Sequence, residues 1–127
     1  MKKWFCLALL LSGCAGADRG EELLPLASAL TKLSAAVEAQ VRYGQAPADL
    51  DDQALLALAT GHDPGLLAPF AGYELRVRRD NGHGLVLVCD DGRALLEDAG
   101  CTGPLDAQRW HQASACDFSL ELAAICR

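Results

Sequence analysis

The 127-residue sequence contains no apolar stretch long enough to cross a lipid bilayer as a helix. Its longest unbroken apolar run, from Trp4 to Leu11, has eight residues, whereas a membrane-spanning helix needs about 20. The apolar core of an export signal is shorter, at about 7–15 residues. The run is therefore too short for a permanent transmembrane helix and has the length of a signal-peptide core.

The common signatures of catalytic and cofactor sites are also missing. No G-x-S-x-G elbow surrounds Ser114 or Ser119, and the chain has no glycine-rich phosphate loop. The three histidines, His62, His83 and His111, stand at unrelated spacings, and the aspartate-rich segments lack the pattern of a calcium loop. We therefore expect no catalytic residue, no metal site and no cofactor, and we expect that the protein is not an enzyme.

Basic residues are scarce, with 11 Lys and Arg against 17 Asp and Glu and a net charge of −6. An acidic protein is not drawn to phosphate backbones by its overall field, so we expect no nucleic-acid partner. Arg76, Arg78 and Arg93 are a local exception, because the first two alternate along one predicted strand and the third begins another. They predict a basic patch for an acidic partner, a phosphate of lipopolysaccharide or a glycan acid. The alternative is a solvated strand face in which they pair with Glu74 and Glu97, and pairs of that kind add little stability.

The cysteines fall into two groups, and four of them lie in the last third of the chain. These four are Cys89, Cys101, Cys116 and Cys126. An even number without C-x-x-C spacing favours two disulfides over a zinc site. A 116–126 bridge is disfavoured, because the segment between has no Gly or Pro and, as a helix, would hold its ends about 15 Å apart, against the 7 Å or so that a disulfide tolerates. The pairing otherwise stays open.

The N-terminus has the parts of an export signal, with Lys2 and Lys3 before the apolar run and small residues after it. Leu11-Ser12-Gly13-Cys14 resembles the lipobox of bacterial lipoproteins, in which a Leu and two small residues precede an obligatory Cys. The resemblance implies cleavage before Cys14, a diacylglycerol on its thiol and acylation of its new amine. Several acyl chains anchor a protein stably. The alternative is an ordinary secretory signal.

The resemblance also implies an organisation and a location. Residues 1–13 would be a signal peptide that is removed, residues 14–20 a lipidated tether, and residues 21–127 a single globular periplasmic domain. Ala15 follows Cys14 where an Asp would favour the inner membrane, so the resemblance implies the outer membrane, facing the periplasm. That compartment permits disulfides, and the membrane itself would be one partner, through the lipid.

Hydrophobic periodicity predicts an α+β domain, with N-terminal helices packed on a small antiparallel meander sheet and a disulfide-stapled C-terminal part. Apolar residues at three- and four-residue steps predict a helix over 21–43, and Asp49 or Asp51 is placed to cap a second helix over 53–59. Alternating residues and tight-turn sequences predict strands over 73–78, 85–89 and 93–97.

The predictions for particular side chains are more detailed. Tyr73, Leu75 and Val77 should face a core, and the 85–89 strand should be buried on both faces. A short helix is predicted over 104–112, with Trp110 packing inward. Alternation through Phe118, Leu120 and Leu122 predicts a fourth strand.

Three functional classes remain open. The favoured one is a non-catalytic binding or assembly accessory that holds another envelope protein. The second is a binder of a small ligand or of an envelope component, such as a lipid or glycan, in a pocket between helix and sheet. The third is an envelope enzyme, which would need a nucleophile and a base that the sequence does not show.

Overall fold

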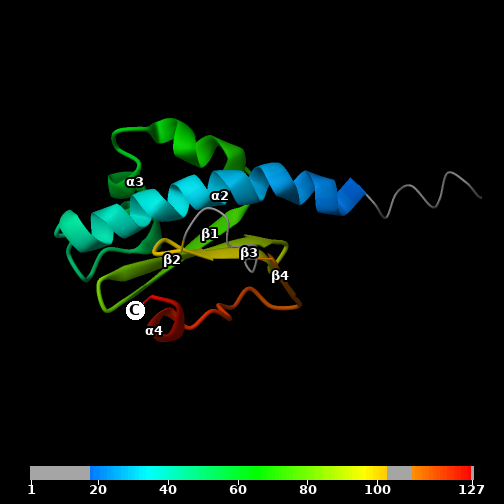
Figure 1. Cartoon of the computed structure of the whole chain (residues 1–127). Helices are drawn as coiled ribbons and strands as arrows, with labels where there is room; N and C mark the ends of the chain where they lie inside the picture. Colours follow the sequence, from blue (N-terminus) through cyan, green and yellow to red (C-terminus); the bar gives the residue numbers. More distant parts are fainter. Residues whose placement is uncertain (1–17, 103–109, 127) are drawn as a thin grey trace, which may run out of the picture.

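The computed structural model describes residues 18–102 and 110–126. Helices cover one face of a four-stranded antiparallel sheet, and a C-terminal segment, residues 114–126, lies on the other face (Figure 1). In chain order the elements are α2 (Asp18–Tyr43), α3 (Asp52–Ala59), the 3₁₀ helix η1 (Pro64–Phe70), β1 (Glu74–Asp80), β2 (His83–Asp90), β3 (Arg93–Ala99), β4 (Trp110–Ala113) and α4 (Leu122–Ile125). The predicted α+β class, with helices on an antiparallel meander, is confirmed.

The long helix α2 supplies most of the helical layer. It begins at Asp18, inside the segment assigned to the tether, so the predicted start at 21 is three residues late. The apolar stripe of α2 is buried against β2 and β3, where Val86, Val88 and Leu96 meet it. The helix ends at Tyr43, before Gly44. Burial of one continuous stripe therefore fixes this helix across the sheet.

The second helix and the segment after it complete the helical layer. Asp51 caps α3 as predicted, because its carboxylate accepts the N–H of Ala54 at 2.8 Å. Residues 66–72 had no predicted structure, and most of them belong to η1, which buries Phe70 in the main core. Tyr73 lies outside β1 and is exposed, so its predicted burial is wrong.

The first three strands follow local turn chemistry. Asn81-Gly82 and Asp91-Gly92 both hold positive φ at their two central positions, which is the geometry of a two-residue hairpin turn. The strands are ordered β1-β2-β3-β4, so β2 is central. Residues of β2 are buried on both faces, as predicted: one face meets α2 and the other meets the C-terminal segment.

The predicted helix over 104–112 is wrong where the structure tests it. Residues 103–109 lie outside the described residues, and Trp110–Ala113 form β4 on the edge of β3. The exposed edge of β3 offers unpaired N–H and C=O groups, and pairing with them overrides local helical preference. The predicted inward packing of Trp110 falls on a side chain outside those that the structure describes.

The predicted fourth strand through Phe118, Leu120 and Leu122 is also wrong. Residues 117–121 pair with no strand, and Leu122 begins the short helix α4. The reason is the carboxylate of Glu97, which accepts the N–H groups of Ser119 and Leu120 at 2.8–3.0 Å and the Ser119 hydroxyl at 2.8 Å. Those backbone N–H groups thus donate to a side chain instead of to a neighbouring strand. The segment lies across the face of the sheet and not beside an edge.

Two disulfides attach this segment to the sheet. Cys89 is bonded to Cys116 and Cys101 to Cys126, each with 5.7 Å between Cα atoms. The predicted disulfides are confirmed, and the disfavoured 116–126 bridge is not formed. The two bridges close loops of 27 and 25 residues, and in the chain-entropy account each is worth about 3.5 kcal/mol.

Close approach of α2 to the strands depends on Gly100, which follows β3. A methyl group added at Gly100 would overlap the carbonyl oxygen of Ser34 and the Cβ of Glu38. The N–H of Gly100 also donates to the carbonyl of Gly84 at 2.9 Å. The absence of a side chain at Gly100 therefore sets how tightly helix and sheet pack.

We expect Gly100→Ala to lower the free energy of unfolding by about 1–3 kcal/mol, because helix backbone must move to admit the methyl group. Urea denaturation measures the change. Gly61→Ala is the matched control: its added methyl would lie 3.5 Å from the nearest atom, in ordinary contact. Equal midpoints for Gly100→Ala and Gly61→Ala would contradict this account of the packing.

Candidate functional site

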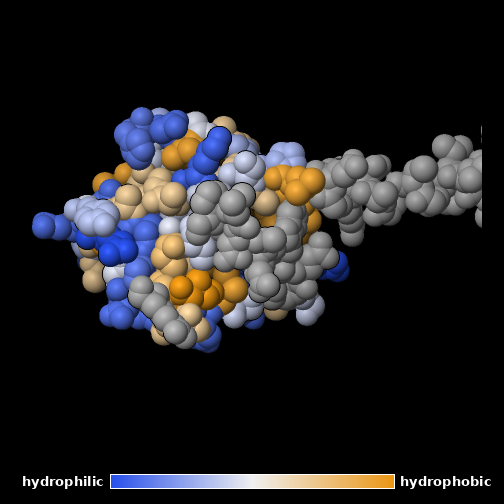
Figure 2. All heavy atoms as spheres, viewed as in Figure 1, coloured by the Kyte–Doolittle hydropathy of each residue, from blue (hydrophilic) through white to orange (hydrophobic). Residues whose placement is uncertain are grey.

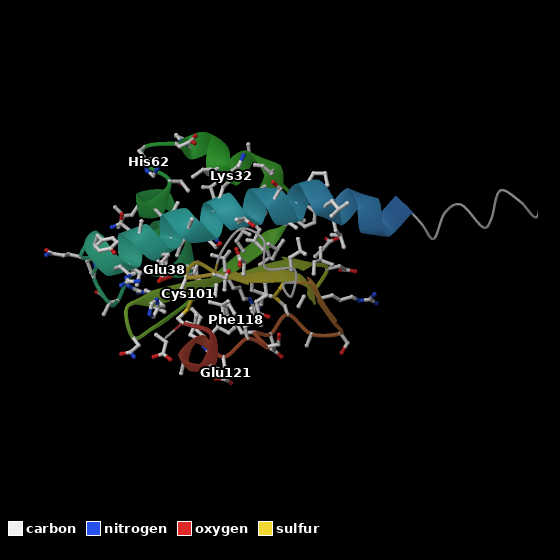
Figure 3. The ribbon with its side chains drawn as sticks, viewed as in Figure 1. Lys32, Glu38, His62, Cys101, Phe118 and Glu121 are labelled. Carbon is white, nitrogen blue, oxygen red and sulfur yellow. A yellow bond between two sulfur atoms is a disulfide. The ribbon has the colours of Figure 1, made fainter. Side chains whose placement is uncertain are left out.

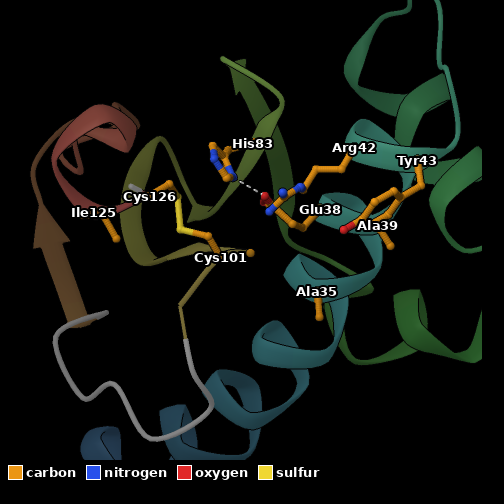
Figure 4. Close-up of a pocket in the computed structure, with 10 residues that line it drawn as sticks. Ala35, Glu38, Ala39, Arg42, Tyr43, His83, Cys101, Ile125 and Cys126 are labelled. Atoms are coloured by element: carbon orange, nitrogen blue, oxygen red, sulfur yellow. Dashed lines mark hydrogen bonds and ion pairs between the residues drawn. A yellow bond between two sulfur atoms is a disulfide. The ribbon is translucent and has the colours of Figure 1, made fainter.

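A hollow of about 400 Å³ opens where the C-terminal half of α2, the start of β2 and the C-terminal segment meet (Figure 4). Its lining brings together groups that are far apart in sequence: Glu38 from α2, His83 from β2, and the bonded pair Cys101 and Cys126. Figure 2 shows one face of the molecule, on which hydrophobic residues come to the surface in small patches among hydrophilic ones. The hollow is the candidate site because an acid, an imidazole and a disulfide meet in its lining.

An acid–imidazole pair forms one wall of the hollow. His83 Nδ1 lies 2.5 Å from Glu38 Oε1, and the N–H of Gly84 donates to Oε2 at 3.0 Å. The side chains of His83 and Glu38 are only 16% and 9% exposed. Both carboxylate oxygens are thus engaged by the β1–β2 hairpin, and the imidazole keeps Nε2 as its other ring nitrogen.

The disulfide between Cys101 and Cys126 forms another part of the lining (Figure 4). A ring nitrogen of His83 and the two sulfur atoms all lie within 4.8 Å of one another. Imidazole and thiolate are good ligands for transition metals, but a sulfur held in a disulfide is not a thiolate. Among the residues that the structure describes, these three form the cluster that could hold a metal, and the redox state of the bridge decides whether they can.

The rim of the hollow is cationic and aromatic. The guanidinium of Arg42 stacks over the ring of Tyr43 at 5.6 Å from its centroid, and Tyr43 is 76% exposed. Both residues come from the last turn of α2. The rim therefore presents a charge and a broad ring to a partner of the hollow.

A second hollow, of about 510 Å³, lies between α2 and η1. Lys32 and Asp63 are the charged residues in its lining, which also includes Pro25 and Pro69. It lacks the paired acid and imidazole of the first hollow, so it offers less chemistry.

The arginines predicted to form a basic patch are only partly brought together. Arg76 donates to Glu74 at 3.1 Å and to the carbonyl of Cys116 at 2.8 Å. Arg78 stacks over Phe118 at 5.7 Å. Both therefore lie against the C-terminal segment, while Arg93 begins β3, beyond β2.

Of the two glutamates expected to pair with these arginines, Glu74 does so, whereas Glu97 binds the C-terminal segment. Glu74 pairs with Arg76, as the alternative interpretation predicted. Glu97 is fully buried and serves the backbone of the C-terminal segment. An acidic partner for Arg76 and Arg78 stays a prediction, and the contacts give Arg76 a role in holding the fold.

Several long-range side-chain contacts escaped the sequence analysis, among them those of Arg79 and Glu38. Arg79 of β1 holds the loop before α3. Its guanidinium donates to the carbonyls of Pro47, Ala48 and Leu50 at 2.9–3.2 Å. The Glu38–His83 pair joins residues 45 positions apart. A signal for Glu38 did exist, since it stands three residues before Val41, at the edge of the apolar stripe, and a carboxylate buried there needs a partner.

The remaining candidates lie elsewhere. His62 is exposed in the turn after α3, apart from Glu38 and Cys101 (Figure 3). Ser119 bonds to Glu97, so its hydroxyl has a structural partner. Cys14 lies outside the described residues, as do the signal peptide and most of the tether, and the side chain of His111 is likewise outside them.

No protein-family model matches the chain, and neither a curated protein nor a solved structure matches it significantly. Within residues 18–102 and 110–126, no helix combines the length and the apolar character that crossing a bilayer requires.

We expect Arg76→Ala to lower the free energy of unfolding by about 0.5–1.5 kcal/mol, because the Cys116 carbonyl loses its donor. Arg93→Ala removes the same side chain from an exposed strand end and should change stability by less than about 0.5 kcal/mol. Urea denaturation of both variants checks the difference. A loss from Arg93→Ala as large as that from Arg76→Ala would refute a specific role for Arg76.

Glu38→Ala should cost about 1–3 kcal/mol of unfolding free energy, because the buried N–H of Gly84 loses its acceptor. Glu121 is an exposed glutamate whose side chain caps no helix, so Glu121→Ala is the matched control and should be nearly neutral. Thermal and urea unfolding measure both. Wild-type stability in Glu38→Ala would show that the acid–imidazole wall does not support the hairpin.

Proposed function

We propose that the chain is a lipid-anchored bacterial envelope protein, cut before Cys14 and acylated on that residue. The observation that carries the proposal is the lipobox-like Leu11–Cys14 directly after an apolar run of signal-peptide length. An apolar segment of eight residues is too short to hold a protein in a bilayer, whereas several acyl chains hold it stably. Attachment then depends on the Cys14 thiol.

The redox state of the domain supports export on separate grounds. All four cysteines after Cys14 are paired in two disulfides. Disulfides persist in oxidising compartments such as the bacterial periplasm and are rare in the cytosol. By the resemblance to lipoproteins, the proposed address is the outer membrane, with the domain facing the periplasm.

We propose that the domain acts as a non-catalytic accessory that binds another envelope protein. Arg and Tyr are enriched at protein interfaces and among their energetically dominant residues, and Arg42 and Tyr43 stack together at the rim of the hollow. From Asp18 to Tyr43, α2 rises by about 38 Å. The helix therefore carries the rim far from the lipidated end, where a partner has access.

A second candidate function is the binding of a small envelope component. Its support is the volume of the hollow, about 400 Å³, which lies within the ~300–1,000 Å³ of ligand pockets. Crosslinking from position 43 separates the two roles, because a protein partner gives a discrete crosslinked band and a small ligand gives none.

Cys14→Ala should incorporate no labelled palmitate in a bacterial host, because the lipobox no longer has a thiol to take the lipid. Cys6→Ala is the matched control: it removes a cysteine from the leader and leaves the lipobox intact, so labelling should equal that of the wild type. Metabolic labelling followed by density-gradient separation of the membranes measures attachment and address together. Normal labelling of Cys14→Ala would overturn the proposal.

A further inference from the structure

The hollow contains a nearly complete set of zinc ligands. Cys101, Cys126 and His83 contribute two sulfurs and a ring nitrogen that lie within 4.8 Å of one another. In a tetrahedral zinc site, bonds of about 2.3 Å to sulfur and 2.0–2.1 Å to nitrogen place the ligand atoms about 3.5–3.8 Å apart. Small movements of these side chains would therefore suffice, once the two sulfurs are no longer bonded to each other.

His83 has the kind of carboxylate contact that supports many metal-binding histidines. Its Nδ1 is engaged by Glu38 at 2.5 Å, and Glu38 is fixed in turn by the N–H of Gly84. Metal-binding histidines commonly donate one ring N–H to a carboxylate, which fixes the ring and leaves the other nitrogen for the metal. Glu38 thus supplies the supporting contact that such a site needs.

The two disulfides differ in access. Cys101 is half-buried and lines the open hollow together with Cys126, which is 9% exposed, whereas Cys89 and Cys116 are 0% and 7% exposed in a cluster with Leu87, so the difference in access lies at Cys101. A bridge is reduced by direct attack of a thiolate on sulfur, so access governs which bridge opens first. The Cys101–Cys126 bridge is the reactive one by this criterion, and the other bridge would still hold the C-terminal segment.

We propose that Cys101, Cys126 and His83 bind one zinc ion when the Cys101–Cys126 disulfide is reduced. A dithiol reductant supplies two electrons and two protons and becomes a disulfide itself, leaving two cysteine thiols. Zinc then displaces both thiol protons to solvent and binds two thiolates and the imidazole. The fourth position faces the hollow, as the open position does in catalytic zinc sites.

This inference departs from the sequence-based expectation of no metal site, which rested on spacing along the chain. The three ligands lie at positions 83, 101 and 126, far from any C-x-x-C pattern, and only the fold brings them together. The proposal does not depend on lipid anchoring, and its test uses a chain that cannot be acylated.

The experiment uses the full chain with Cys6→Ala and Cys14→Ala, so that the N-terminal thiols bind no metal. Limited treatment with a dithiol, followed by thiol labelling and mass mapping, should show Cys101 and Cys126 free before Cys89 and Cys116. The protein reduced in this way should bind one equivalent of Co²⁺, with a sulfur-to-metal charge-transfer band that Zn²⁺ abolishes. The oxidised protein should show no such band.

Substitutions of His83 and Glu38 then test whether these residues hold and support the metal. His83→Ala should weaken Zn²⁺ binding at least tenfold and Glu38→Gln about tenfold, while His62→Ala, the exposed control, should change nothing. Circular dichroism verifies that each variant is folded. The proposal fails if the reduced, folded protein gives no cobalt–sulfur band, if His83→Ala binds like the wild type, or if reduction unfolds a domain that Zn²⁺ does not restore.

Discussion

The structure depends on covering a central strand that is apolar on both faces. Residues Leu85 to Cys89 of β2 are all buried, so the sheet needs a layer on each side. On one side the stripe of α2 meets that need with regular helical packing. On the other side the cover is a C-terminal segment that is mostly irregular, and its backbone N–H groups must find partners without a ladder. Glu97 accepts two of them, and the disulfides fix the position of the segment.

The hollow is a consequence of this arrangement, because it lies where all three layers end together. Gly100 allows α2 to approach the sheet, and that approach brings Glu38 onto the β1–β2 hairpin at His83, the first residue of β2. Cys126, at the end of the cover, completes the lining by bonding to Cys101. Each layer contributes one functional group, so the chemistry of the hollow exists only in the folded chain.

Features that depend on neighbouring residues were predictable from the sequence, and features that depend on residues far apart in the chain were not. The helix α2 and the hairpin at Asn81-Gly82 were predicted because periodicity and turn chemistry are local. The edge strand β4 and the course of residues 117–121 were not, since both are decided by groups on β3 some 20 residues away, among them Glu97. The same holds for the Glu38–His83 pair. The predicted lipid anchor has a local signal, but it stays a prediction because its residues lie outside the described ones.

A reducible bridge in a structural cover would ordinarily threaten the fold, since losing one costs about 3.5 kcal/mol against a typical total of about 5–15 kcal/mol. Here the cover has attachments that do not involve Cys101. Arg76 holds the carbonyl of Cys116, and Glu97 holds the amides after Phe118. The buried Cys89–Cys116 bridge closes the same region. Opening the Cys101–Cys126 bridge would therefore remove only the covalent attachment of α4 and Cys126, since Leu122 of α4 is also buried in a cluster with Leu85. Zinc binding to the freed thiolates would recover part of the lost stability.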